Sequence, residues 1–110
     1  MIESRPLVIS SGQNTGMSLR LCVLIWPRPE MAEALHSYEA QVLPLLTEHH
    51  GRLIARERVQ GATADDPAEI QIIEFDNDVA LAEYMNDPRR LSLETQRAAA
   101  VERTQILRLQ

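Results

Sequence analysis

The fold of this chain is decided by the stretch E-I-Q-I-I-E-F-D-N-D-V-A-L-A-E-Y-M-N-D-P, from Glu69 to Pro88. Its first seven residues are rich in isoleucine and end in phenylalanine, a composition typical of a buried strand. The next three carry side-chain oxygens that can cap a helix, which we expect from about Asn77 to Met85. Asp87 and Pro88 break that helix and can start a further one, which we expect to end near Val101.

The same succession of strand and helix occurs earlier in the chain. We expect a first strand over Leu19–Trp26, ended by two prolines, and then a helix to about His49 or His50. One face of this helix is apolar at helical spacing and comprises Met31, Leu35, Tyr38, Val42, Leu45 and Leu46. Pro44 should kink the helix, and Gly51 is a good residue to end it.

Two more strands complete the pattern. Residues 52–59 alternate in polarity and predict a strand, followed by a turn over residues 60–68. The last strand is expected over Arg103–Leu109. The order β-α-β-β-α-β, with the second helix in two pieces, predicts an α+β fold: the ferredoxin-like arrangement with a four-stranded antiparallel sheet.

The first strand is apolar on both of its faces, which predicts a partner chain. Leu21, Val23 and Ile25 alternate with Cys22, Leu24 and Trp26. Helices cover only one face of such a sheet, so the other face needs a second cover. The same face of a second copy, related by a two-fold axis, is the simplest cover. We therefore expect a homodimer with its two sheets packed together.

Composition excludes several classes of function. The chain has 110 residues and a net charge of −5, and all 11 of its basic residues are arginine. An acidic chain is poorly suited to binding nucleic acid, and the absence of lysine excludes Schiff-base chemistry and a phosphate-loop lysine. We expect no membrane span and no signal peptide. With Cys22 as its one cysteine, the chain is expected in the cytoplasm.

The domain proper is expected over residues 19–110, after a flexible extension over Met1–Ser18. The extension is rich in serine, glycine and other turn-forming residues. Within it, Leu7–Ile9 could add a short edge strand. A tag or a mis-annotated start is the alternative interpretation.

Residues 19–109 resemble the dimeric α+β barrel superfamily, most closely its small bacterial DUF1330-type proteins. The segments that carry the resemblance are L-H-S-Y-E-A-Q-V-L-P (35–44), E-H-H-G-R-L-I-A-R (48–56), I-I-E-F (72–75) and A-E-Y-M-N-D-P-R-R-L (82–91). The chain departs from the family at His50, where the family has glycine, and at Arg89-Arg90. The resemblance implies a dimer with a pocket between sheet and helices in each subunit. Related branches include cofactor-independent monooxygenases, haem-degrading enzymes, isomerases and non-catalytic binders, and the fold does not choose among them.

Glu74 and Tyr38 are the candidate catalytic residues. Glu74 is a carboxylate in an otherwise apolar strand, where it is either an acid or base in a pocket or the partner of an arginine such as Arg56 or Arg108. Tyr38 on the buried helix face is either core filling or a donor to a ligand. Candidate ligand-binding residues are Trp26, Arg56, His49 and Tyr84.

Each of these residues also has a purely structural interpretation. Trp26 could wall a pocket or seal the dimer interface, and His49 and His50 suit the negative end of the first helix. His36 lies beside the apolar stripe, and we expect it to be solvated. Because the chain lacks paired cysteines and H-E-x-x-H, we predict no metal and no cofactor.

Three functions stay open at this point. The first is a homodimer that binds a small molecule without changing it. The second is a cofactor-independent enzyme, monooxygenase- or isomerase-like, that uses Glu74 as acid or base. The third is an interaction module whose N-terminal extension does the binding. The sequence favours the ligand-binding dimer with an unassigned activity.

Overall fold

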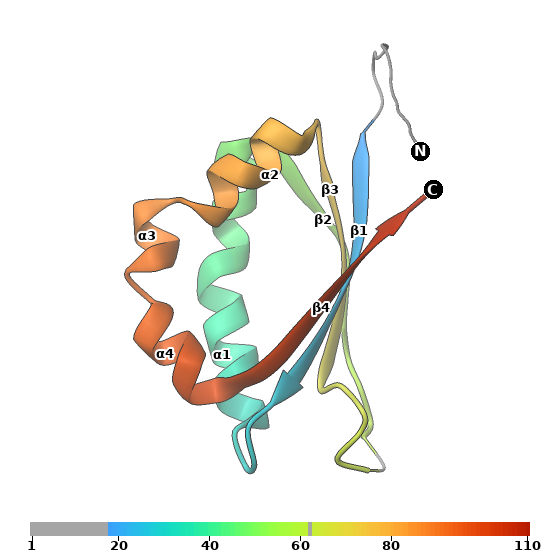
Figure 1. The fold of residues 1–110 in the computed structure, drawn as a ribbon, viewed down its shortest axis with the longest axis vertical. Helices are drawn as coiled ribbons and strands as arrows, with labels where there is room; N and C mark the ends of the chain where they lie inside the picture. Colours follow the sequence, from blue (N-terminus) through green and yellow to red (C-terminus); the bar gives the residue numbers. More distant parts are fainter. Residues whose placement is uncertain (1–17, 62) are drawn as a thin grey trace.

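A computed structural model describes residues 18–61 and 63–110, so the expected extension over residues 1–18 lies outside the described part except for Ser18. Four antiparallel strands form one sheet in the order β2-β3-β1-β4, and the helices pack on one side of it (Figure 1). The strands are β1 (Leu19–Pro27), β2 (Gly51–Arg58), β3 (Glu69–Phe75) and β4 (Val101–Leu109). The helices are α1 (Ala32–Val42), the 3₁₀ helix η1 (Leu43–His49), α2 (Asp78–Met85), α3 (Pro88–Leu91) and α4 (Glu94–Ala100).

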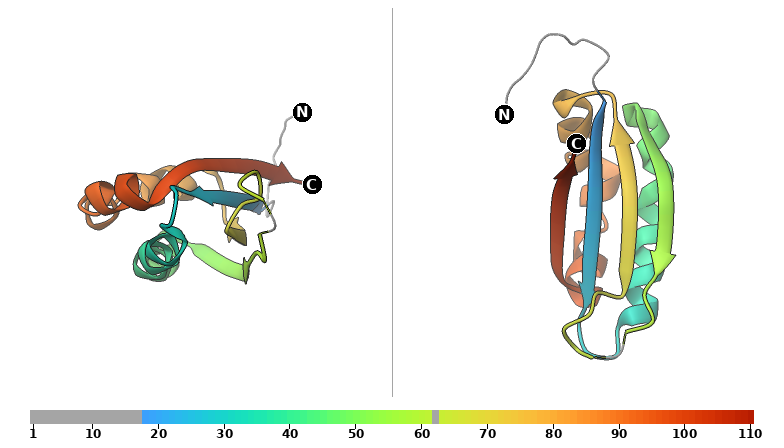
Figure 2. Two further views of the ribbon diagram at one scale, coloured as in Figure 1. Left: turned by 90° about the horizontal axis from the view of Figure 1, so that it is seen from below. Right: turned by 90° about the vertical axis from the view of Figure 1, so that its right-hand side faces the viewer.

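The central strands β1 and β3 have the bounds expected from their apolar runs, with β1 one residue longer. Leu21, Val23 and Ile25 of β1 are buried under the helices, and Ile73 and Phe75 of β3 lie beside them. The alternate residues point to the other side, which no helix covers in the described part of the chain (Figure 2). The prediction that β1 has two apolar faces is therefore confirmed.

The first helix changes character at Pro44. α1 ends at Val42, and the chain continues as η1 with the proline in its first turn. A proline cannot donate the hydrogen bond that an α-helix needs at this point, so the predicted kink takes the form of a change in helix type. Leu35, Tyr38 and Val42 are buried as expected of the apolar face.

The helical segment ends at His49, as expected, but the residue that stops it is His50 and not Gly51. His50 adopts the left-handed conformation with φ 56°, and its backbone N–H bonds the Leu46 carbonyl. Gly51 is instead the first residue of β2 and is packed under Phe75. A Cβ atom there would lie 2.8 Å from the Phe75 ring, so the position needs glycine for space.

The alternation of β2 is interrupted by a bulge between Leu53 and Ala55. Before the bulge, Arg52 pairs with Glu74 on the open face, whereas after it Arg56 pairs with Gln71 on the helix side. Side chains along a regular strand alternate between its two faces, which predicts that Arg52 and Arg56 lie on the same face. The extra residue, Ile54, separates them onto opposite faces of the sheet.

The second helical segment has three pieces where two were expected. Asn77 Oδ1 accepts from the Ala80 N–H, and Asp87 Oδ1 accepts from the Arg89 N–H, so both predicted caps are present. The segment after Pro88 divides into α3 and α4. In the described part of the chain, no helix is long and apolar enough to cross a membrane.

Candidate functional site

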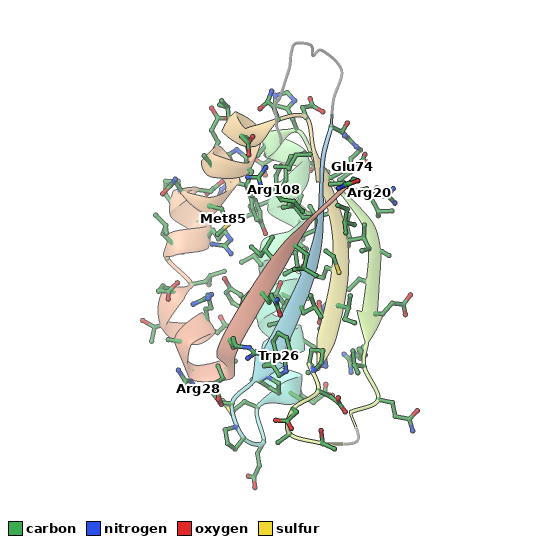
Figure 3. All side chains as sticks on the ribbon, turned by 45° about the vertical axis from the view of Figure 1, so that its right-hand side comes forward. Arg20, Trp26, Arg28, Glu74, Met85 and Arg108 are labelled. Atoms are coloured by element: carbon green, nitrogen blue, oxygen red, sulfur yellow. The ribbon has the colours of Figure 1, made fainter. Side chains whose placement is uncertain are left out.

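A cavity of about 330 Å³ lies between the helix-facing side of the sheet and the helices. Its apolar wall is formed by Leu21, Val23, Ile25, Ile73, Phe75, Leu81, Met85 and Ile106. Its polar wall is formed by Glu39, Gln71, Tyr84, Arg90, Glu94, Arg97 and Thr104. Met85 is one of these lining residues, and Figure 3 shows its side chain on the helix side of the sheet. A volume of this size and a mainly apolar wall suit a small organic molecule.

Glu39 of α1 supplies a buried carboxyl group to the cavity wall. Its side chain is 9 % exposed, and its Oε1 accepts from Gln71 Nε2 at 2.8 Å. Burial raises the pKa of Glu39 above its ordinary value, the bond from Gln71 opposes this, and the nearby Glu69 carboxylate raises the pKa further. A carboxyl group in this state can give or take a proton.

Behind Glu39 lies a second, fully buried carboxylate, Glu69 of β3. Its oxygens accept from Arg56 Nε at 2.8 Å and Gln71 Nε2 at 2.6 Å, and its Oε1 lies 2.6 Å from His36 Nδ1. Burial raises the pKa of Glu69, but the hydrogen bonds from Arg56, Gln71 and His36 outweigh it and lower the pKa. The lowered pKa favours the anionic form of Glu69, whereas the raised pKa of Glu39 favours its neutral form.

His36 is buried and bonded to Glu69, so the expectation that it is solvated is wrong. It lies one residue beyond Leu35 on α1, at the edge of the buried face. A histidine can occupy that position because a carboxylate from β3 meets its ring nitrogen. Arg56 also donates to the His36 carbonyl at 2.8 Å, which ties β2 to α1.

Two tyrosines accompany the charged groups. The Tyr84 hydroxyl donates to the Val42 carbonyl at 3.4 Å, and burial raises the pKa of Tyr84 to about 12. The Arg90 guanidinium lies over the Tyr84 ring, 5.1 Å from its centroid. The hydroxyl of Tyr38 is buried and has no hydrogen-bond partner within the described ranges. Burial raises the pKa of Tyr38 as well, and all of its charged neighbours line the cavity.

The predicted residues divide between the two faces of the sheet. Tyr84 lines the cavity and Tyr38 lies next to it, whereas Glu74 and Trp26 lie on the open face. Glu74 pairs with an arginine, one of the two alternatives, but its partner is Arg52 at 3.3 Å and not Arg56 or Arg108. Figure 3 shows Glu74 beside Arg20, its neighbour on β1.

Trp26 and His49 each have partners of their own. Trp26 Nε1 donates to the Asp65 carbonyl at 2.8 Å, and the Arg103 guanidinium lies 3.8 Å from the centroid of its ring. His49 Nε2 lies 2.7 Å from Asp87 Oδ2, next to the start of α3. Hydrogen bonds from Arg89 and His49 hold the pKa of Asp87 well below its usual range. His49 thus anchors α3 to the end of η1.

The sequence analysis missed Glu39, Gln71 and Arg90. A signal was present for the first two: Glu39 is four residues after Leu35 on the apolar helix face, and Gln71 shares its side of β3 with Phe75. Arg90 carried no such signal. Among residues 18–61 and 63–110, no group of three or more His, Cys, Asp or Glu is placed to hold a metal ion.

Comparison with known proteins places the fold. A dimeric protein of unknown function with a ferredoxin-like fold from Bacteroides fragilis superposes with a TM-score of 0.67 at 15% identity, covering 84% of this chain and 95% of its own. The chain has the ferredoxin-like fold. A protein of unknown function from Rhodopseudomonas palustris gives 0.68 at 21% identity, covering 86% of this chain and 82% of its own.

A NIPSNAP-family protein with unknown function from Agrobacterium tumefaciens is similar to the same degree. Its TM-score is 0.69 at 15% identity, covering 87% of this chain and 89% of its own. No family model matches the chain, and no curated protein matches its sequence. At these identities the ferredoxin-like fold is shared, and the activity is open.

Proposed function

We propose that this protein is a homodimer that binds a small, mainly apolar organic molecule in the cavity of each subunit. The observation that carries the proposal is the cavity itself, which combines a wall of aliphatic and aromatic side chains with a few polar groups at one side. Such a combination gives affinity through apolar burial and orientation through the polar groups.

The open face of the sheet supports the dimer. Its centre is apolar, with Cys22 and Leu24 on β1, Ile70 and Ile72 on β3, and Leu107 on β4. Leu107 is 44% exposed in the single chain, and leaving such a face in water would be costly for so small a domain. Packing against the same face of a second copy covers it, with Trp26 sealing the rim. The similar Bacteroides fragilis protein is described as dimeric.

Proton transfer without a cofactor is the second candidate function. Glu39 favours it, because a buried carboxyl group with a raised pKa lines the cavity and can act as acid or base. Tyr84 or Tyr38 would then meet a carbonyl or enolate oxygen. Glu74 is also proposed as an acid or base. Its site would lie on the open face of the sheet and would be completed by the second copy of the chain.

The finer family assignment and the compartment are also proposals. Assignment to the DUF1330-type proteins rests on the four matching segments of sequence. Location in the cytoplasm rests on Cys22, which has no disulfide partner in the described part of the chain.

A cavity-filling variant tests the proposed site. Ile106 lines the cavity and is 45% exposed, so Ile106→Trp should fill the cavity and leave the core in place. Val79→Trp, at a position that is 65% exposed on α2, is the matched control. A library of small aromatic and aliphatic compounds would be screened by ligand-observed NMR. We expect hits that bind wild type and Val79→Trp and are lost in Ile106→Trp. Equal binding to all three proteins would refute the site.

The same hits distinguish binding from catalysis. A compound recovered unchanged after incubation supports a binding protein. A converted compound supports the second candidate, and Glu39→Gln should then abolish conversion while binding persists. Conversion that persists in Glu39→Gln and is lost in Glu74→Gln would assign the chemistry to the open face instead.

A further inference from the structure

We propose that the ligand of the cavity is an organic acid, bound as the anion with its charged group on Arg90 and its apolar body against the sheet. This inference rests on the proposed function and names its ligand class. The geometry that points to it is a cationic side chain in the wall of a mainly apolar cavity, with no ion-pair partner among residues 18–61 and 63–110.

Of the two arginines in the cavity wall, Arg90 is the one without an ion pair to any described residue. Within the described ranges it makes no ion pair within 4.0 Å, and its Nε atom is buried without a hydrogen-bond partner. The second arginine of the wall, Arg97, is paired with Glu94 at 3.3 Å. A buried donor on a charged group is costly when it has no acceptor, so a carboxylate placed here would supply what the protein lacks.

The surroundings of Arg90 fix its position. Its guanidinium carbon lies over the Tyr84 ring, 5.1 Å from the centroid, and this cation–π contact favours the position of the group. A planar guanidinium held in this way can present two N–H groups side by side, the arrangement that matches a carboxylate. The buried hydroxyl of Tyr38 is a further donor that has no hydrogen-bond partner in the described part of the chain, and Arg90 is one of its charged neighbours.

Glu39 is the group that could oppose an anion. Its carboxyl is held by Gln71, and burial raises its pKa, which favours the neutral acid. The titratable and charged groups around it are His36 and Tyr38 of α1, Arg56 of β2, Glu69 of β3, Tyr84 of α2, Arg90 of α3, and Glu94 and Arg97 of α4. Burial outweighs the lowering effect of Arg90 on the pKa of Glu39, and a neutral Glu39 leaves the charge of Arg90 available to a ligand.

The rest of the cavity suits the body of such an acid. Ile73 and Phe75 of β3 and Ile106 of β4 form an apolar floor, and Met85 of α2 lies on the helix side. A thioether side chain adapts to ligands of different shape. The expected ligand is therefore amphiphilic, with a single anionic group at one end.

Matched pairs of acids and amides test this ligand class. The probes are trans-cinnamate with trans-cinnamamide and octanoate with octanamide, titrated calorimetrically into the wild-type protein above the pKa values of the acids. We expect an acid to bind roughly tenfold or more tightly than its amide, as for a charge-assisted hydrogen bond. This comparison needs no variant, so it stands even if a substitution prevents folding.

Two arginine variants locate the charged group. Arg90→Gln should abolish the preference for the acid, whereas Arg97→Gln should keep most of it because Arg97 is already paired. Amides that bind wild type as tightly as their acids would overturn the inference and leave the cavity as a binding site for neutral molecules. A preference that survives in Arg90→Gln would also overturn it. If no probe of either kind binds, the proposed function fails and the inference fails with it.

Discussion

The side-chain amide of Gln71 donates to Glu39 Oε1 at 2.8 Å, and the same nitrogen lies 2.6 Å from Glu69 Oε2. One amide group therefore separates two buried carboxyl groups that would otherwise face each other. The Gln71 side chain thereby links Glu39 in the cavity wall to the buried cluster formed by His36, Arg56 and Glu69. The pKa values of the two carboxyl groups shift in opposite directions, because burial dominates at Glu39 whereas hydrogen bonds from Arg56, Gln71 and His36 outweigh burial at Glu69.

Removing the Gln71 amide should destabilise the protein. Gln71→Leu leaves both carboxyl groups without this donor, and we expect a loss of about 1–3 kcal/mol in the free energy of unfolding. Chemical denaturation followed by circular dichroism measures it. The control is Gln41→Leu, because Gln41 is exposed on α1 and makes one long bond of 3.4 Å to Ser37. Equal effects of the two substitutions would show that the amide does not bridge the carboxyl groups.

Two neighbouring arginines on β2 should differ in their contribution to stability. Arg56 pairs with the fully buried Glu69, whereas Arg58 pairs with an exposed glutamate, Glu33. Arg56→Met leaves a buried charge without its partner and should cost about 3–5 kcal/mol. Arg58→Met should cost about 1 kcal/mol or less. Urea denaturation of both variants checks this, and similar costs would contradict the assigned burial of the Glu69 cluster.

Stability should fall with rising pH because of Glu39. The pKa of Glu39 is raised above its ordinary value of 4.5, so from that pH upward the folded state keeps a proton that the unfolded state has lost. The stability from this group is lost as the pH rises through the folded pKa. The opposite contribution, from the lowered pKa of Glu69, is lost only as the pH falls below the ordinary range.

Glu39→Gln should therefore flatten the decline of stability above pH 4.5, since an amide does not titrate. The measurement is the free energy of unfolding from urea titrations at a series of pH values. Glu33→Gln, at an exposed position of the same helix, is the control and should keep the wild-type slope. An unchanged slope in Glu39→Gln would contradict the raised pKa.

A charge in the open face should separate the dimer. Leu107 of β4 lies beside Cys22 in the apolar centre of that face, and Leu107→Glu would bury a charge in each copy of the interface. We expect a monomer by light scattering after size exclusion. Val79→Glu, on the helix side, should stay dimeric. A Leu107→Glu variant with the wild-type mass would show that this face is not the interface.

The sequence predicted the strands and helix caps well because their signals are local. β3 begins and ends at the expected residues, since its β-branched run lies between a proline turn and the cap at Asn77. The kink at Pro44 and the cap at Asp87 follow in the same way from the chemistry of one or two residues. The order of these elements was enough to predict the topology.

The site was predicted only in part because its contacts depend on distant partners. The bulge at Ile54 is set by pairing with β3 and moves Arg56 to the helix side, which the period of the strand alone could not indicate. His36 and Glu39 are polar residues on a buried face, and each is compensated by a residue of β3. Glu74 was predicted as a catalytic residue, but it lies on the open face of the sheet. Glu69 and Gln71 of the same strand face the helices.

Native mass spectrometry of the purified protein under gentle conditions tests the central claim most directly. The account predicts the mass of two chains plus that of up to two small molecules, which are released on denaturation and are absent from Ile106→Trp. A dimer without added mass that also fails to take up any compound of the screen would contradict the proposed binding function. A monomer would contradict the packing of two sheets through their open faces.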